Sequence, residues 1–267
     1  MHRNPKIPLT LIASGLDPSG SAGLIADVRV MSNLGCHTCG VVTCETIQNS
    51  KGVKAVYPSN NAVLRDQINS IVSDLRPQSI KIGAIASLDT ANVLRETLSD
   101  LEGVPIVIDP VLKPTKGDNF LSTDDYRKLA DELFGMATLA TPNITELFAL
   151  ADFTAEPVDE AVLEAARIWI KLGLKAVLVT GLIRGENVID RLIDSTDSSE
   201  LQISDFSHPI IKTGEIHGTG CVLSSAIAAF LAFGENLTDA SRRGSEYTFG
   251  VIKKAGALGS GSSFWTL

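Results

Sequence analysis

The sequence alternates short apolar runs with amphipathic segments, and this alternation recurs five times. Short apolar runs are typical of buried strands, and apolar residues spaced three and four apart are typical of the helices that cover them. The predicted strands are Leu9–Ser14, Gly40–Cys44, Ser79–Ile82, Pro105–Ile108, Thr138–Ala140 and Ala176–Val179. The predicted helices between them are Ala22–Leu34, Asn60–Leu75, Leu88–Leu101, Asp124–Phe134 and Val158–Leu172. This pattern predicts an α/β fold with a mostly parallel central sheet flanked by helices.

The second half of the chain departs from the alternation. A strand pair is predicted at Val188–Ile193 and Glu200–Ile203, separated by the polar turn Asp194–Ser199. Two helices follow, from about Gly218 to Ala232 and from Thr238 to Ala255, and the tail Gly256–Ser263 is predicted to be a loop. Because no linker, repeat or low-complexity tract divides the chain, we expect one domain over residues 1–267.

Charge and hydropathy exclude several classes of partner. Lys and Arg number 23 against 31 Asp and Glu, which gives a net charge of -8, and no basic run is present. Nucleic acids and anionic membrane surfaces are therefore poor partners. No apolar stretch reaches the roughly 18 residues of a membrane span, and residues 1–8 lack the pattern of a signal peptide. We expect a cytoplasmic protein.

The four cysteines do not form a disulfide framework of the kind found in small secreted domains. Cys36 and Cys39 form a Cys-x-x-Cys pair, but no second pair of Cys or His ligands completes a zinc site. Burial as small apolar side chains and a metal or redox role both remain open.

Ligands of open α/β sheets bind beyond the carboxyl ends of the strands, so the loops that follow strands were searched for chemistry. The loop Gly15–Gly23 is rich in glycine and precedes Asp27 on a helix, and it matches neither a dinucleotide fingerprint nor a P-loop. After Thr43, the next loop carries Glu45 and Gln48, and an amide there could pair with an aminopyrimidine edge. An ordinary strand-to-helix turn explains the first segment equally well, and a solvated turn is the favoured interpretation of the second taken alone.

Two further loops carry carboxylates. Asp109 directly follows an apolar strand and could hold a hydrated magnesium ion. The segment Thr141–Glu146 opens a helix, where Asn143 or Thr141 could cap the helix with Glu146 completing the cap, or the same side chains could serve catalysis.

The segment His217–Cys221 is the most informative, because it runs directly into a helix of small residues. Its glycines can turn several backbone amides toward one point, which holds an anion without a basic side chain. Such a cradle would stabilise a phosphoryl group in transfer. The helix dipole would favour the thiolate of Cys221, making that residue a candidate base. A glycine-rich turn with a packed cysteine is the alternative.

Taken in order, these segments resemble the hydroxymethylpyrimidine and phosphomethylpyrimidine kinases of thiamin synthesis, a branch of the ribokinase-like family with a three-layer αβα fold. The resemblance extends from Leu9 to about Ala255. It rests on Asp17–Asp27, Gln48-Asn49, Lys81-Ile82-Gly83, Asp109-Pro110-Val111, Thr141-Pro142-Asn143 with Glu146, and His217–Cys221.

The resemblance implies an ATP- and Mg²⁺-dependent kinase acting on a small molecule, and a homodimer is the family-level expectation. It implies a base, Cys221, beside an anion hole formed by Gly218, Thr219 and Gly220. The substrate-binding residues would be Gly15, Asp27, Glu45, Gln48, Ala84 and Val111. The resemblance also implies ATP-binding residues and metal ligands, which would be Asn143, Thr180 and Gly181 for ATP and Asp109 and Glu146 for the metal.

Several positions depart from the family pattern. Thr180-Gly181 stands where Lys-Gly is usual, which removes a phosphate contact. Ala84 replaces a frequent methionine and would widen the pocket, and Glu45 replaces a small or apolar residue. We expect Glu45 to line the pocket or bind a partner.

Two other functions remain open. A pyridoxal or pyridoxine kinase faces the same chemistry, and a pyrimidine-binding regulator that has lost turnover would explain the departures at Thr180 and Ala84. His37 and His208 are assigned no function, and Trp169 and Trp265 are expected to be packing groups.

Overall fold

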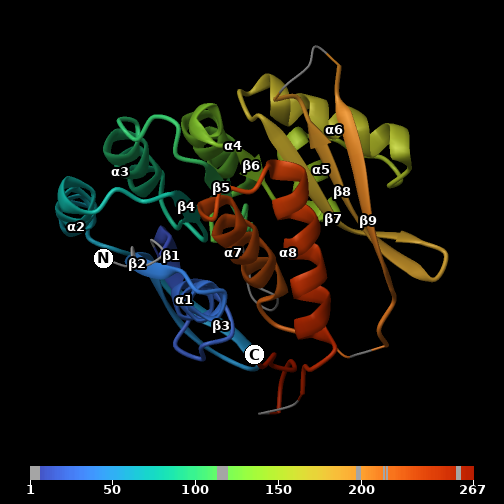
Figure 1. The fold of residues 1–267 in the computed structure, drawn as a ribbon, viewed down its shortest axis with the longest axis horizontal. Coiled ribbons are helices and arrows are strands. Elements are labelled where there is room, and N and C mark those ends of the chain that lie inside the picture. The colour runs from blue at the N-terminus through green and yellow to red at the C-terminus, as the bar shows by residue number, and fades with distance from the viewer. Residues whose placement is uncertain (1–6, 113–119, 197–199, 213, 215, 257–259) are drawn as a thin grey trace, which may run out of the picture.

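A computed structural model describes residues 7–112, 120–196, 200–212, 214, 216–256 and 260–267. Its strands form a nine-stranded sheet in the order β3-β2-β1-β4-β5-β6-β7-β8-β9 (Figure 1). The strands are β1 (Leu9–Leu16), β2 (His37–Asn49), β3 (Gly52–Pro58), β4 (Ser79–Ile82), β5 (Ile106–Ile108), β6 (Leu139–Ala140), β7 (Ala176–Arg184), β8 (Asn187–Asp194) and β9 (Gln202–Pro209).

The central strands, from β2 to β7 in that order, are parallel, and antiparallel hairpins extend both edges of the sheet. Parallel neighbours require crossover connections, which the intervening helices supply. Because the central strands run the same way, their carboxyl ends meet at one edge of the sheet, where a ligand site can form.

Helices cover both faces of the sheet (Figure 1). One face carries α1 (Gly23–Asn33), α7 (Thr219–Ala232) and α8 (Leu237–Ile252). The other carries α2 (Asn61–Asp74), α3 (Leu88–Leu98), α4 (Thr123–Leu133), α5 (Ile144–Ala151) and α6 (Asp159–Lys171). The mostly parallel sheet flanked by helices, predicted from the alternating sequence, is confirmed, and so is the three-layer αβα fold that the resemblance implies.

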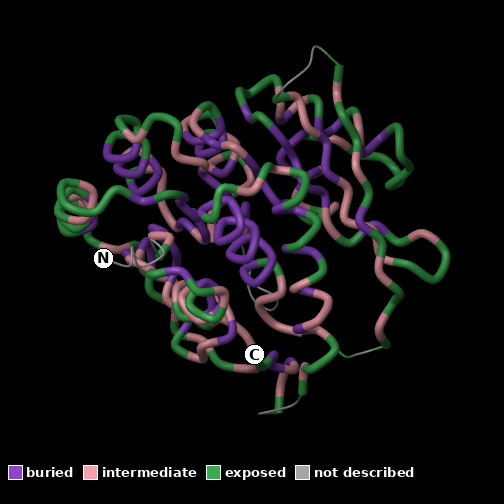
Figure 2. Tube along the Cα trace, in the orientation of Figure 1, coloured by how far each residue is buried: buried purple, intermediate pink, exposed green. Residues whose placement is uncertain are grey.

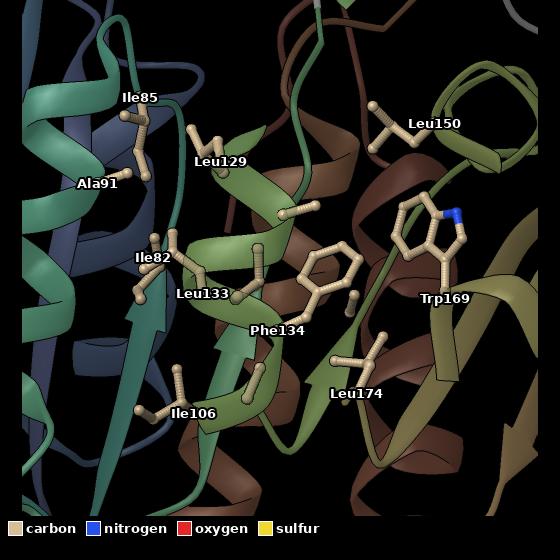
Figure 3. Close-up of a cluster of buried hydrophobic side chains, with 14 of the residues drawn as sticks. Ile82, Ile85, Ala91, Ile106, Leu129, Leu133, Phe134, Leu150, Trp169 and Leu174 are labelled. Atoms are coloured by element: carbon tan, nitrogen blue, oxygen red, sulfur yellow. The ribbon is translucent and has the colours of Figure 1, made fainter. Parts of the chain in front are cut away.

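Each central strand contributes to two cores, because successive side chains point to opposite faces. In β4, Ile80 and Ile82 pack beneath α2 to α4, whereas Lys81 points to the α1 and α7 side. Figure 3 shows the first core, where Phe134 and Trp169 pack with their ring centroids 5.0 Å apart. Trp169 and Trp265 are both buried, as expected of packing groups.

Helix α7 is buried along nearly its whole length, between the sheet and helices α1 and α8 (Figure 2). Its small residues permit this position, because the neighbouring backbones approach closely. A Cβ atom added at Gly244 of α8 would lie 2.4 Å from Ile227 of α7. The amino end of α7 is thereby fixed at the carboxyl edge of the sheet.

The sheet is larger than the sequence pattern predicted. The segment after Thr43, read as a loop, continues β2 to Asn49 and turns back as β3. Strand β7 likewise runs on to Arg184 and pairs with β8. Part of the predicted turn Asp194–Ser199 and part of the tail Gly256–Ser263 lie outside the described residues. Among the helices that the structure describes, none has the length and apolar character needed to cross a membrane.

Candidate active site

A cavity of about 690 Å³ lies at the carboxyl edge of the sheet. Its walls come from the ends of β1 and β2, the segments after β4, β5 and β6, and the turn that precedes α7. The predicted site residues that line it are Gly15, Gln48, Ala84, Asp109, Val111, Asn143, Glu146, Thr180, Gly181, Gly218, Thr219, Gly220 and Cys221. The structure thus brings together segments as far apart in the sequence as Gly15 and Cys221.

The first loop is organised around Asp17, which the sequence argument quoted but gave no role. Its carboxylate accepts hydrogen bonds from the Ser19 backbone at 2.7 Å, from the Ala22 backbone at 3.0 Å and from Nε2 of His217 at 3.2 Å. Burial raises the pKa of Asp17, but hydrogen bonds from His217, Gln48 and Ser19 outweigh burial and hold that pKa well below its ordinary value. Asp17 is therefore an anion that links the first loop to the start of α7.

Glycine is required where this loop meets the turn before α7. Gly218 has φ of +85°, and a Cβ atom there would lie 1.8 Å from the carbonyl oxygen of Ser21. Indole Nε1 of Trp265 donates to the same carbonyl at 2.7 Å. A side chain at Gly218 would push these two walls of the cavity apart.

Gly218 is the N-cap residue of α7, and the first intrahelical bond runs from the Val222 amide to its carbonyl at 3.1 Å. The amides of Thr219, Gly220 and Cys221 precede that bond, so helix geometry gives them no intrahelical partner. All three residues line the cavity. The three residues of the predicted amide cradle, Gly218, Thr219 and Gly220, therefore line the cavity.

Cys221 and Asp109 are neighbours at the cavity floor, and the Cys221 thiol is a hydrogen-bonding partner of the Asp109 carboxylate. Ser224 Oγ also donates to Asp109 at 3.3 Å. Burial raises the pKa of Cys221 well above its ordinary value, although Lys81 opposes the shift. The expectation that the helix dipole favours a thiolate is wrong, because burial and the nearby carboxylates outweigh it.

Below this pair lies a fully buried ion pair. Lys81 Nζ is 2.8 Å from Asp27 Oδ2 and 4.0 Å from Asp109 Oδ2. Burial alone would lower the pKa of Lys81, but the surrounding charges, chiefly that of Asp27, hold it well above its ordinary value. Gly83 leaves room for the ammonium, since a Cβ atom there would lie 2.7 Å from Nζ.

Asp27 does not line the cavity, so its prediction as a substrate contact is wrong. Its side chain is fully buried, and besides Lys81 it accepts a hydrogen bond from Ser225 Oγ of α7 at 2.8 Å. The spacing that places Asp27 one turn into α1 points it under α7 rather than toward the opening. Its role in this structure is to join α1, β4 and α7.

One wall combines Gly15, Ala84 and Val111 with the amide of Gln48. Gln48 also hydrogen-bonds to Asp17. Glu45 is exposed and does not line the cavity, so the first of its two predicted roles is wrong. The reason is strand alternation: β2 continues through this segment, and residues 46 and 48 face the cavity while 45 and 47 face outward.

The opposite wall begins at α5. Asn143 accepts from the Glu146 backbone at 3.0 Å and Glu146 accepts from the Asn143 backbone at 2.9 Å, which completes a capping box. Asn143 rather than Thr141 is the cap, and both Asn143 and Glu146 line the cavity. Capping and ligand contact are therefore compatible at this position.

Thr180 and Gly181 lie within β7, where the register with β8 shifts between Val179 and Leu182. Gly181 has φ of +77°, and its amide donates to Asp190 at 3.3 Å. Among the described residues that line the main cavity there is no lysine or arginine. The backbone amides at the start of α7 are therefore candidates for binding an anion in this cavity.

Asp109 and Glu146 both line the cavity and supply the hard oxygen ligands that magnesium prefers. Among the described residues, no group of three or more His, Cys, Asp and Glu side chains is arranged to hold a metal. This donor set fits an ion that takes its other ligands from water and phosphate, as magnesium does with nucleotides.

Sequence reasoning missed several residues. It quoted Asp17, Lys81 and His217 in motifs without assigning them chemistry, and it gave His208 no function. A polar residue inside a buried strand, as Lys81 is in Ser79–Ile82, was the available signal, since a buried charge requires a partner.

Comparison with known proteins agrees with this geometry. A sequence profile described as phosphomethylpyrimidine kinase matches residues 17–265. A hydroxymethylpyrimidine/phosphomethylpyrimidine kinase of Staphylococcus aureus strain MSSA476 is 33% identical over 258 residues, covering 96% of this chain and 91% of the relative. A kinase of the same description from Mycobacterium bovis is 37% identical over 258 residues, covering 95% of this chain and 91% of the relative.

Solved structures show the same fold. A phosphomethylpyrimidine kinase from Clostridium difficile 630 superimposes with a TM-score of 0.77 at 29% identity, covering 92% of this chain and all of that one. A Bacillus subtilis pyridoxal kinase in complex with ADP gives a TM-score of 0.87 at 23% identity, covering 98% and 97%. The second likeness concerns the fold alone. The profile match and the identity over nearly the whole length show that the chain belongs to the phosphomethylpyrimidine kinase family, with the ribokinase-like fold.

Proposed function

We propose that this protein uses ATP to phosphorylate the hydroxymethyl group of 4-amino-5-hydroxymethyl-2-methylpyrimidine, the monophosphate of that alcohol, or both, in thiamin biosynthesis. One observation carries the proposal: the amide cradle of α7, the Cys221–Asp109 pair and the Gln48 wall line one cavity. A flat ring and a phosphoryl donor could therefore meet there. The family membership supports a kinase.

The substrate wall suits an aminopyrimidine. Gly15, Ala84 and Val111 leave a shallow apolar surface for a flat ring, and the Gln48 amide can donate and accept at the ring edge. Ala84 leaves more room than a longer side chain would. A substrate on this wall would share the cavity with Cys221.

Proton removal must accompany transfer, because the hydroxyl proton leaves as the oxygen–phosphorus bond forms. The raised pKa of Cys221 means that a resting thiolate is not the base. Instead, the substrate proton passes to sulfur as the thiol proton passes to Asp109, its hydrogen-bonding partner. Burial raises the pKa of Asp109, which makes that carboxylate a better proton acceptor than an exposed one.

ATP would place its phosphates on the amides of Thr219, Gly220 and Cys221, next to Thr180 and Gly181. Asn143 would contact the nucleotide while keeping its cap. Asp109 and Glu146 would hold Mg²⁺, which neutralises phosphate charge when bound, and the Cys221 proton would pass to the Asp109 oxygen that is not bound to the metal. The cradle has no lysine or arginine beside it among the described lining residues, so backbone amides carry the transition-state stabilisation.

The proposal is tested by incubating purified protein with MgATP and each of three phosphoryl acceptors: the pyrimidine alcohol, its monophosphate and pyridoxine. ADP release and chromatographic detection of the phosphorylated products give kcat/KM for each. We expect pyrimidine products to form with the higher kcat/KM. A preference for pyridoxine would favour the alternative kinase, and binding of the pyrimidine without ATP consumption would favour a regulator.

The proposal also includes a single kinase domain over residues 1–267, a cytoplasmic location and a homodimer. Ile47 and Tyr57 are exposed apolar side chains at the β2–β3 hairpin, and Glu45 pairs in register with Tyr57. This outward face supports self-association, with Glu45 in its second predicted role, that of a partner contact. Sedimentation should give twice the monomer mass, and Ile47→Lys should shift it to the monomer; a wild-type monomer would contradict this.

A further inference from the structure

A second cavity of about 340 Å³ adjoins the amide cradle. Thr180, Gly181, Ile216, Thr219 and Gly220 line both cavities, so a nucleotide with phosphates on the cradle can extend into the second one. Most of its remaining wall is apolar, from α7, α8 and the end of β9. Apolar walls with few polar groups suit an aromatic base.

Besides Thr248, the polar part of that wall is a hydrogen-bonded series of three side chains from β8, β9 and α8. Ser245 Oγ lies 2.6 Å from Asp190 Oδ2, and His208 Nε2 lies 2.9 Å from the same hydroxyl. Asp190 Oδ1 accepts from the Gly181 amide at 3.3 Å. Both carboxylate oxygens thus act as acceptors.

The direction of the hydrogen bonds among Asp190, Ser245 and His208 determines which ring nitrogen of His208 carries the proton. Ser245 Oγ donates its single proton to Asp190 Oδ2, and this bond, with that from the Gly181 amide, opposes the rise in the pKa of Asp190 that burial causes. The Ser245 oxygen must then accept from His208, which places a proton on Nε2. In the neutral imidazole, Nδ1 is consequently a hydrogen-bond acceptor. Phe249 stacks against one face of the His208 ring, with the ring centroids 4.6 Å apart and an angle of 13° between the ring planes. This contact holds the plane of the imidazole.

An acceptor at this position distinguishes purines. The six-position of adenine carries an amino group that donates, whereas the six-position of guanine carries an oxygen that accepts. We infer that His208, oriented by Ser245 and Asp190, is a specificity-determining residue that selects adenine over guanine nucleotides. The inference rests on the proposed function only in placing the nucleotide phosphates on the α7 cradle.

The experiment measures ADP and GDP dissociation constants by calorimetry, alongside phosphate transfer from ATP and GTP. Wild-type protein should bind ADP about tenfold or more tightly than GDP. The adenine amino group would donate a hydrogen bond to Nδ1 of His208, whereas the guanine oxygen would place a second acceptor opposite the same nitrogen. His208→Leu should bring the ratio of the two constants close to one. Ser245→Ala should lower it partly, because the ring loses its orientation, and His208→Gln, whose amide offers an acceptor, should restore part of it.

His37→Leu is the matched control, since His37 is exposed and lines neither cavity. It should leave the ratio unchanged, and thermal unfolding of each variant verifies the fold. Equal affinity of wild-type protein for ADP and GDP, or an unchanged ratio in His208→Leu, would overturn the inference. Selective ADP binding without phosphate transfer would overturn the proposed function and support this inference.

Discussion

Lys81 and Asp27 show how a polar pair can be structural even when it lies beside a site. Neither side chain has exposed surface, and Ser225 extends their contact to α7. A buried ion pair adds little net stability compared with an apolar pair of the same shape, but breaking it leaves an uncompensated charge. The main role of the pair is therefore to position the α7 backbone.

Asp27→Asn should lower the free energy of unfolding by about 3–5 kcal/mol, because Lys81 then remains buried beside a neutral amide. Urea unfolding followed by the fluorescence of the buried Trp169 and Trp265 measures it. The double variant Asp27→Asn with Lys81→Met should be more stable than the single variant, since the unpaired ammonium is removed, but the recovery should be partial because Asp109 loses the Lys81 charge 4.0 Å away. A single variant as stable as the wild type would contradict this assignment.

Cys221→Ser should reduce kcat by about 10²-fold or more while KM for the pyrimidine changes little, because a hydroxyl releases and takes protons less readily than a thiol. Steady-state kinetics with MgATP measures both constants. Cys39→Ser is the control, since Cys39 is a partly exposed thiol outside the cavity and should leave kcat unchanged. Unchanged turnover in Cys221→Ser would remove the thiol from proton transfer.

At the scale of elements, the position of the amino end of α7 depends on the close approach of Gly218 to the Ser21 carbonyl. Gly218→Ala must relieve contact with the Ser21 carbonyl and also adopt a left-handed conformation. Either adjustment moves the cradle, and a displacement near 1 Å can cost about 10²-fold in rate. We expect kcat/KM to fall by about that factor.

Gly234, just beyond the other end of α7, is the matched control for this substitution. It has φ of +87° and nothing within 4 Å of an added Cβ atom. Gly234→Ala therefore carries the same backbone penalty without the steric contact, and its kcat/KM should stay close to the wild-type value. If both variants lose activity equally, the close approach is not what positions the cradle.

The same elements show what the sequence could predict. The parallel strands and their helices carry their own apolar periodicity, so their positions followed directly from the residues. The β2–β3 hairpin did not, because Glu45-Thr-Ile-Gln alternates on an exposed edge and its polar members resemble a loop. Strand β7 was cut short for a related reason: Thr180-Gly181 interrupts its apolar run at a register shift.

The sequence predicts which segments form the site, but not which way their side chains point. Glycine-rich loops at strand ends located the cavity, because topology alone brings those ends together. Whether a side chain such as that of Asp27 or Glu45 faces the cavity depends on helix rotation and strand register, which no motif encodes. The lowered pKa expected for Cys221 was wrong because burial, and after it the charge of Asp109 from a distant part of the chain, raises that pKa.

At the scale of the whole molecule, burying both sheet faces also buries several groups that must keep their protons. Burial raises the pKa of Cys36 and of Cys44 from 9.0 to about 11. Burial also raises the pKa of Tyr126, and the charge of Asp27 overcomes burial to raise that of Lys81. In all four groups the pKa is raised, so each keeps its proton to a higher pH in the folded protein than in the unfolded chain.

The consequence is a steep loss of stability in alkali. A group whose pKa is raised in the folded state keeps its proton there, while the unfolded chain releases it at the ordinary value, so a rise in pH favours unfolding. Stability should hold up to about pH 8 and then fall between pH 9 and 11, by on the order of 2–3 kcal/mol for Cys44 alone. Urea unfolding at fixed ionic strength across this range measures the slope. Cys44→Ala should flatten it, whereas Cys39→Ala, at a less buried thiol, should flatten it less; identical slopes in both variants would show that burial of Cys44 does not govern the alkaline limit.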